Sequence, residues 1–198
     1  MIALFGPAGS GKSLQGQALA EKYGWRWLSV GQLLRDQHNP EIDEKLKGGE
    51  LFDDSFVTEL MHQAMVEADK AGEKVILDGY PRDEWQAKWI AEKGDAAKIE
   101  LAIVFEVPAE ELWKRIEGRG RSDDTEVVVK RRWEIFEQNI CSILPVLQDA
   151  GVRVEHLNGV GEIDEVTKRI EALLLDSGLV EEVVWDDDEW DDEKSYGE

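Results

Sequence analysis

Cysteine is almost absent from this chain, and its scarcity is the first limit on the chemistry the protein can use. Cys141 is the single cysteine among 198 residues, so no internal disulfide can form and no cysteine cluster can hold zinc. It falls in an apolar, helix-like pattern, which predicts a small buried side chain. We therefore expect a protein of a reducing compartment, and the cytoplasm is the simplest choice.

Long apolar segments and positive charge are also scarce. No stretch approaches the roughly 20 apolar residues of a membrane helix, and the start, MIALFGPAGS, lacks the basic region of a signal peptide. The chain holds 23 Lys and Arg against 44 Asp and Glu, a formal charge of −21. So acidic a surface repels nucleic acid backbones and anionic membranes. We therefore expect no nucleic acid partner and no membrane partner.

Part of this acidity is concentrated at the C-terminus. Residues 181–198 hold ten acids and one lysine, a composition typical of a disordered, solvating tail. The alternative is a docking peptide for an unknown partner, with Val183, Val184, Trp185 and Trp190 as apolar anchors. We place the folded domain at residues 1–178 and the tail at 179–198.

Short apolar runs alternate with helical patterns along the folded domain. The predicted strands are Ile2–Phe5, Trp27–Val30, Val75–Leu77, Leu101–Val107 and Val152–Leu157. The predicted helices are Gln15–Tyr23, Phe56–Ala71, Trp85–Lys93, Ala109–Glu117, Glu126–Gln148 and Ile163–Leu175. Near-continuous apolarity, as in LAIVFEV, suits a parallel strand covered by helices on both faces. The alternation predicts an α/β fold: three αβα layers around a five-stranded, doubly wound parallel sheet.

A complete phosphate-binding loop (P-loop), GPAGSGKS at residues 6–13, follows the first predicted strand. Its glycines let successive backbone N–H groups turn toward an anion, and the next helix adds its N-terminal dipole. Lys12 can reach the β- and γ-phosphates, and the Ser13 hydroxyl is placed for Mg²⁺. We expect the loop to bind a nucleoside triphosphate through Gly9, Ser10, Gly11, Lys12, Ser13 and Leu14. A P-loop alone leaves the reaction open.

Three later segments carry arginines: LSVGQLLR (28–35), LDGYPR (77–82) and GRGRSDD (118–124), which runs on to KRR at 130–132. Residues 114–132 hold seven Lys and Arg against four acids. Phosphoryl transfer between two nucleotides brings several phosphates together, and positioned cations stabilise the moving group. A basic island in so acidic a chain favours such a site; the alternative is a solvated helix face with ordinary ion pairs.

With these four motifs in this order, the chain resembles the adenylate kinases and, more broadly, the nucleoside monophosphate kinases, over about residues 1–175. The resemblance implies phosphoryl transfer from ATP to a monophosphate with Mg²⁺. It also implies a monophosphate-binding flap at 31–72 and a lid at 118–125. This lid is too short for the four metal ligands of long-lid relatives, so zinc is not expected. We also expect a monomer.

The resemblance assigns roles to individual residues. Lys12, Arg82, Arg121 and Arg132 would be catalytic. Arg115, Arg119 and the backbone of Gly161 would contact ATP. Asp78, at a strand end, would hold Mg²⁺ through water together with Ser13; a strand-end cap is the alternative. The residues expected at the monophosphate are Val30, Arg35, Glu50, Leu51, Phe52, Gly79, Tyr80, Pro81, Arg82, Gln86, Arg121 and Arg132.

Two positions bear on which monophosphate is used. Gln86 matches the adenylate kinases and can donate and accept in one plane against the adenine edge; a surface glutamine is the alternative. Val30 stands where adenylate kinases usually have Thr, and the segment 36–49 is shorter than usual. The favoured reaction is ATP + AMP giving two ADP. A UMP/CMP or broad-specificity kinase, and a low-turnover nucleotide-responsive binding protein, stay open as alternatives.

Overall fold

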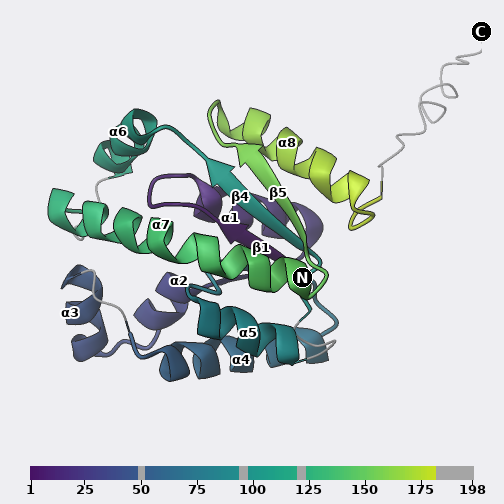
Figure 1. Cartoon of the computed structure of the whole chain (residues 1–198), viewed down its shortest axis with the longest axis horizontal. Coiled ribbons are helices and arrows are strands. Elements are labelled where there is room, and N and C mark those ends of the chain that lie inside the picture. Colours follow the sequence, from purple (N-terminus) through teal and green to yellow (C-terminus); the bar gives the residue numbers. More distant parts are fainter. Residues whose placement is uncertain (49–51, 94–97, 120–123, 182–198) are drawn as a thin grey trace, which may run out of the picture.

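Strands and helices alternate along almost the whole folded domain (Figure 1). The computed structural model describes residues 1–48, 52–93, 98–119 and 124–181, with the backbone alone at residue 119. The elements are β1 (Ile2–Phe5), α1 (Lys12–Tyr23), β2 (Arg26–Ser29), α2 (Val30–Arg35), α3 (Pro40–Gly48), α4 (Asp54–Lys70), β3 (Val75–Asp78), α5 (Glu84–Glu92), β4 (Leu101–Glu106), α6 (Ala109–Arg119), α7 (Glu126–Asp149), β5 (Arg153–Asn158) and α8 (Ile163–Asp176).

The five strands form one parallel sheet in the order β2-β3-β1-β4-β5. In the centre of the sheet, Ile2 of β1 pairs with Ile76 of β3 on one side and with Leu101 of β4 on the other. The chain fills one half of the sheet before it crosses to the other, so the carboxyl end of β1 is a topological switch point, where α/β sheets bind ligands. The predicted α/β fold with a five-stranded parallel sheet is confirmed.

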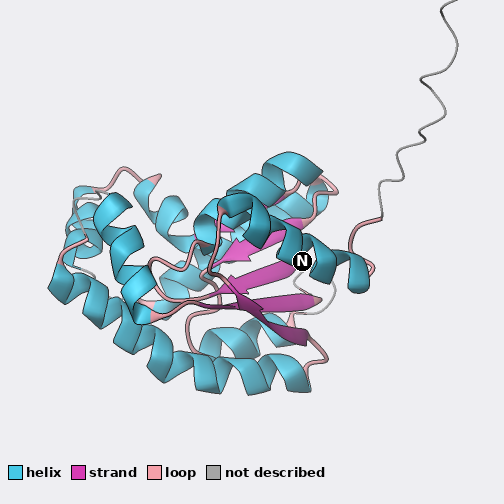
Figure 2. Cartoon of the chain, turned by 90° about the horizontal axis from the view of Figure 1, so that it is seen from above, coloured by secondary structure: helices cyan, strands magenta, loops and turns pink. Residues whose placement is uncertain are grey.

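Helices cover both faces of the sheet (Figure 2). Successive side chains of a strand point to opposite faces, so Ala3 and Phe5 of β1 pack on one side and Ile2 and Leu4 on the other. The first face is covered mainly by α4, α5 and α7, and the second by α1 and α8. Because both faces are buried, the three inner strands β1, β3 and β4 carry apolar residues at nearly every position, whereas the edge strands β2 and β5 are more polar.

The helix that follows the P-loop begins differently from its neighbours. Side chains cap α4, α5 and α7: Asp53, Asp83 and Thr125 each accept a hydrogen bond from a backbone N–H of the first turn. Helix α1 instead begins after Gly11, which is left-handed and gives no side-chain cap. The first N–H groups of α1 are therefore available to a bound anion.

The structure corrects the sequence analysis at three points. Two helices, α2 and α3, were not predicted, and Val30 begins α2 instead of ending a strand. In α2 the apolar residues Val30, Leu33 and Leu34 have helical spacing, but six residues are too few for the pattern to be clear. Cys141 is exposed instead of buried, because a step of about 100° per residue turns it away from the buried stripe of α7.

Within the described segments, no helix has both the length and the apolarity needed to cross a membrane.

Candidate active site

The P-loop depends on its glycines for its shape. Gly9 and Gly11 have φ angles of 90° and 91°, in the left-handed region that favours glycine. A Cβ on Gly9 would lie 2.7 Å from the carbonyl oxygen of Leu112, and one on Gly6 would lie 2.6 Å from the Ser10 hydroxyl. The loop therefore passes too close to its own serine and to α6 to carry side chains at these two positions.

Side chains from two other helices hold the carbonyl groups of the P-loop. The indole Nε1 of Trp133, on α7, donates to the Ala8 carbonyl at 2.9 Å. From α6, Nη1 of Arg115 donates to the Ser10 carbonyl at 3.4 Å and to the Gly159 carbonyl at 3.0 Å. Within the loop, Lys12 Nζ lies 3.4 Å from the Pro7 carbonyl oxygen. The carbonyls are thus turned toward α6 and α7.

Trp133 is a site residue that sequence reasoning missed. It lies in the helix predicted at Glu126–Gln148, in which the sequence analysis gave a site role to Arg132 alone. Its ring also meets Trp113 of α6 edge to face, with centroids 6.1 Å apart. The one sequence signal was the indole N–H, which needs a partner when it is removed from water.

A cleft of about 260 Å³ opens beside the P-loop, at the carboxyl end of β1. Predicted residues that line it are Lys12, Ser13, Arg35, Phe52, Asp78, Gly79, Pro81, Arg82 and Arg132. They come from the P-loop and α1, the predicted flap (31–72), the turn after β3, and α7, which are far apart in the sequence. The fold therefore brings the P-loop lysine and three of the predicted arginines to one cavity.

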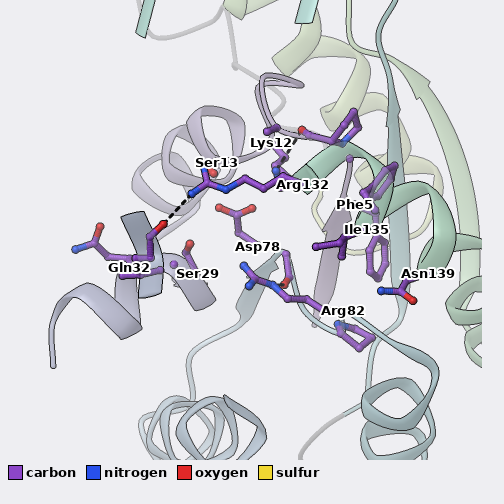
Figure 3. Close-up of a pocket in the computed structure, with 18 of the residues that line it drawn as sticks. Phe5, Lys12, Ser13, Ser29, Gln32, Asp78, Arg82, Arg132, Ile135 and Asn139 are labelled. Atoms are coloured by element: carbon purple, nitrogen blue, oxygen red, sulfur yellow. Dashed lines mark hydrogen bonds between the residues drawn. The ribbon is translucent and has the colours of Figure 1, made fainter. Parts of the chain in front are cut away.

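The charged groups of the cleft face one another (Figure 3). Asp78 lies between Arg82 and Arg132, with Lys12 and Ser13 nearby. Arg82 Nε donates to the Gly79 carbonyl at 2.9 Å. Arg132 donates to Asp124 at 3.3 Å and to the Leu46 carbonyl of α3 at 3.2 Å. Removal of the guanidinium from water lowers the pKa of Arg82; the charge of Asp78 opposes this shift and that of Arg132 adds to it. An arginine stays charged despite such shifts, so the cleft presents fixed positive charge.

Asp78 has the features of a carboxylate that can bind a hydrated metal ion. It ends β3 beside β1, where its Cα pairs with that of Leu4, and only 3% of the residue is exposed. Its Oδ2 has no hydrogen-bond partner among the described residues, and Ser13 lines the same cleft. A carboxylate and a hydroxyl next to a phosphate loop are the oxygen donors that suit Mg²⁺ held partly through water. The residues present fit Mg²⁺.

Several predicted residues do not line the cleft. Val30, Tyr80 and Gln86 are buried. The Tyr80 hydroxyl lies 3.4 Å from that of Thr58, and burial raises its pKa to about 12. Gln86 accepts from the backbone N–H of Arg82 at 2.8 Å and donates to Asp54 at 3.4 Å. Gln86 thus supports the turn that carries Arg82, and its contact with adenine stays a prediction.

Other predictions fall elsewhere. Gly9, Ser10, Gly11, Leu14, Arg115 and Gly161 lie outside the residues that line the cleft. Glu50, Leu51, Arg121, the side chain of Arg119, lid residues 120–123 and tail residues 182–198 lie outside the described residues. In the segments that are described, no three His, Cys, Asp or Glu side chains come together as a metal-binding group.

Helix α7 lines the cleft with more than its arginine. Ile135, Phe136, Asn139 and Ile143 share the cleft with Arg132, at 3, 4, 7 and 11 residues after it, so they form one helix face. Gln32 of α2 lines the opposite wall. Their helical spacing was visible in the sequence, but spacing alone does not distinguish a buried core face from a cleft wall.

Comparisons with known proteins agree with this arrangement. Residues 4–152 match the family model described as "Adenylate kinase". The adenylate kinase of Mycolicibacterium vanbaalenii is 36% identical over 176 residues, covering 85% of this chain and 95% of that protein. Those of Maricaulis maris and Thermus thermophilus are 35% and 33% identical, covering 87% of this chain and 97% and 96% of their own lengths. The motifs of the cleft, the sheet and these matches all lead to one conclusion: the chain belongs to the adenylate kinase family.

Proposed function

We propose that this member of the adenylate kinase family transfers the γ-phosphoryl group of ATP to AMP, giving two ADP, at the junction of the P-loop and the cleft beside it. The observation that carries this proposal is the meeting of Arg35, Arg82 and Arg132 with Lys12 in one cavity. A P-loop that binds only one nucleotide does not need three further guanidinium groups, whereas a second phosphate next to the first does.

On the donor side, the P-loop and the start of α1 bind the phosphates of ATP. The first N–H groups of α1 face the anion because Gly11 leaves them uncapped. Lys12 places its ammonium group over the β- and γ-phosphates, and Ser13 and Asp78 would hold Mg²⁺, which supplies neutralisation of phosphate charge when it is bound. Trp133 and Arg115 keep the loop in shape from behind.

On the acceptor side, Arg35 and Arg82 bind the monophosphate, and Arg132 reaches the phosphates between the two nucleotides. Arg121, Arg119 and the lid complete the site in this proposal. The AMP phosphate is already ionised near neutral pH, since its second pKa is about 6, so no side chain is required as a general base. Catalysis then consists of positioning and of cationic stabilisation of the transition state.

The flap gives the acceptor site a way to respond to its ligand. Leu46 and Phe52 of the flap line the cleft, and the Leu46 carbonyl accepts from Arg132. Movement of the flap onto AMP would exchange this carbonyl for phosphate oxygens at Arg132 and exclude water, so that ATP is not simply hydrolysed. We also infer a monomeric cytoplasmic enzyme acting on small nucleotides, an inference supported by the acidic surface.

The two-site proposal is tested by measuring ATP and AMP affinity separately in matched variants. Arg35→Ala should weaken AMP binding by about tenfold or more while ATP binding is unchanged, because a charge-assisted bond to phosphate is lost. Lys12→Ala should weaken ATP binding while AMP binding is unchanged. Lys47→Ala is the control, since Lys47 is an exposed flap cation outside the cleft. A variant series in which both affinities always fall together would contradict separate sites.

A further inference from the structure

In the loop between β5 and α8, most backbone N–H and C=O groups form hydrogen bonds within the protein. The backbone N–H of Gly159 donates to the Glu106 carbonyl. The N–H of Val160 donates to the Asn158 side chain, and that of Glu162 donates to the Glu165 carboxylate. Their carbonyls are also used: Arg115 donates to Gly159, Arg169 donates to Val160, and α8 donates to Glu162. Among the described residues, the peptide N–H and C=O of Gly161 are the pair in this loop without a partner.

Arg169 is central to this bonding. It lies on α8, and its Nη1 donates to the Asn158 carbonyl at 2.8 Å and to the Val160 carbonyl at 2.6 Å. Gly161 lies over the same guanidinium: its φ is 128°, and an added Cβ would come 3.4 Å from Arg169 Nη2 and would overlap the Glu165 carboxylate. The two carbonyls on either side of Gly159 are thus turned toward one guanidinium. The Gly161 N–H shares a planar trans peptide unit with the Val160 carbonyl, so it points away from that guanidinium.

The loop belongs to the donor side of the P-loop. Nη1 of Arg115 donates to both the Gly159 carbonyl of this loop and the Ser10 carbonyl of the P-loop. Gln15 of α1 donates to the Ile163 carbonyl at 2.9 Å. None of the loop residues 158–163 lines the acceptor cleft. The apolar side chains of Leu14, Val160 and Ile163 are 48%, 37% and 49% exposed, and a nucleobase lying on this surface would cover them.

We propose that Arg169 is a positioning residue that makes the donor-nucleotide site selective for adenine, by holding the backbone N–H and C=O of Gly161 toward the base. This rests on the proposed function, and the resemblance already implies a backbone contact at Gly161. A carbonyl and an N–H side by side match the amino donor and ring acceptor of adenine. Guanine carries a carbonyl acceptor in place of the amino group, so its edge opposes the Gly161 carbonyl.

The test compares ATP and GTP as donors to AMP in Arg169→Gln and Arg169→Lys, with Lys168→Gln as the control. Lys168 is the exposed neighbour of Arg169 on α8, so its variant loses the same charge without the loop contacts. Loss of two charge-assisted bonds in Arg169→Gln should raise the KM for ATP by about tenfold and lower the ATP-to-GTP ratio of kcat/KM by a similar factor. Arg169→Lys can keep one bond and should show a smaller change in the same direction.

A purely structural role for Arg169 predicts a different pattern. The proposal requires kcat and the KM for AMP to stay within about twofold of the parent chain, because the acceptor cleft is untouched. An unchanged ATP-to-GTP ratio, or a KM for AMP that rises together with the KM for ATP as the melting temperature falls, would overturn it. If the parent chain itself failed to phosphorylate AMP, the proposed function would fall instead, so the two failures are distinguishable.

Discussion

The hydrogen bond between Trp133 Nε1 and the Ala8 carbonyl can be removed by Trp133→Phe with little change in shape. The smaller ring keeps an aromatic face toward Trp113, whose ring centroid is 6.1 Å away. A buried carbonyl that loses its partner costs about 1–3 kcal/mol. Ala8 lines the cleft and is partly exposed, so water can replace the indole in part. We therefore expect the free energy of unfolding to fall by about 1 kcal/mol.

The same change should appear in the binding of ATP. If the 2.9 Å bond holds the P-loop in its binding shape, its loss reduces the population of that shape, and 1 kcal/mol corresponds to about fivefold weaker ATP binding. AMP binding should change less, because Arg35 and Arg82, which bind the monophosphate in this proposal, lie outside both the P-loop and α7. Urea unfolding and calorimetric titration with each nucleotide measure these quantities.

Trp85→Phe is the matched control, since Trp85 lies on α5 with half of its surface exposed. It should leave both the stability and the ATP affinity close to those of the parent chain. A Trp133→Phe variant that loses stability but binds ATP as tightly as the parent would contradict this prediction, because the bond would then support the fold without positioning the loop.

Three further changes test the site and its surroundings. Arg82→Ala should lower kcat by about 10²–10³-fold without unfolding the chain, whereas the exposed Arg131→Ala should not, as a coupled turnover assay can show. Asp78→Asn should raise the Mg²⁺ concentration needed for half-maximal turnover; an unchanged requirement would remove Asp78 from the metal site. Burial and the nearby Asp83 raise the pKa of Asp54, so the folded state binds the carboxyl proton of Asp54 more tightly than the unfolded state does. As pH rises and this proton is lost, the buried carboxylate destabilises the folded state. The stability gain from Asp54→Asn should therefore be larger at pH 7 than near pH 4, and equal gains in urea titrations at both pH values would contradict this.

Most of the fold could be predicted because its signals are local. The strands are short apolar runs next to Gly, Pro or charged residues, and all five were found within two residues of their observed ends. Helices α2 and α3 were missed because they are short, and because the contacts of α2 with α3 and α4 form only in the folded chain. Cys141 was misplaced because a helical apolar pattern does not by itself show where the buried stripe ends.

Site residues that belong to a sequence motif could be predicted. Site residues that act by bonding the backbone of another segment could not. Lys12, Arg82 and Arg132 belong to motifs with fixed order, and the fold gathers them in one cleft. Trp133 and Arg169 act through carbonyl groups 125 residues and 9–11 residues away. No residue type marks a carbonyl as a partner, since every residue has one. Such contacts can be found only once the chain is folded.

The proposed function requires a second nucleotide site that accepts a phosphoryl group and prefers AMP. Initial rates of ADP formation from Mg²⁺·ATP, measured with AMP, UMP, CMP and GMP in turn, test it most directly. We predict rapid turnover with AMP and a kcat/KM at least about tenfold lower for each other monophosphate, because each loses a base contact. ATP binding with negligible transfer to every monophosphate, or equal rates with all four, would contradict it.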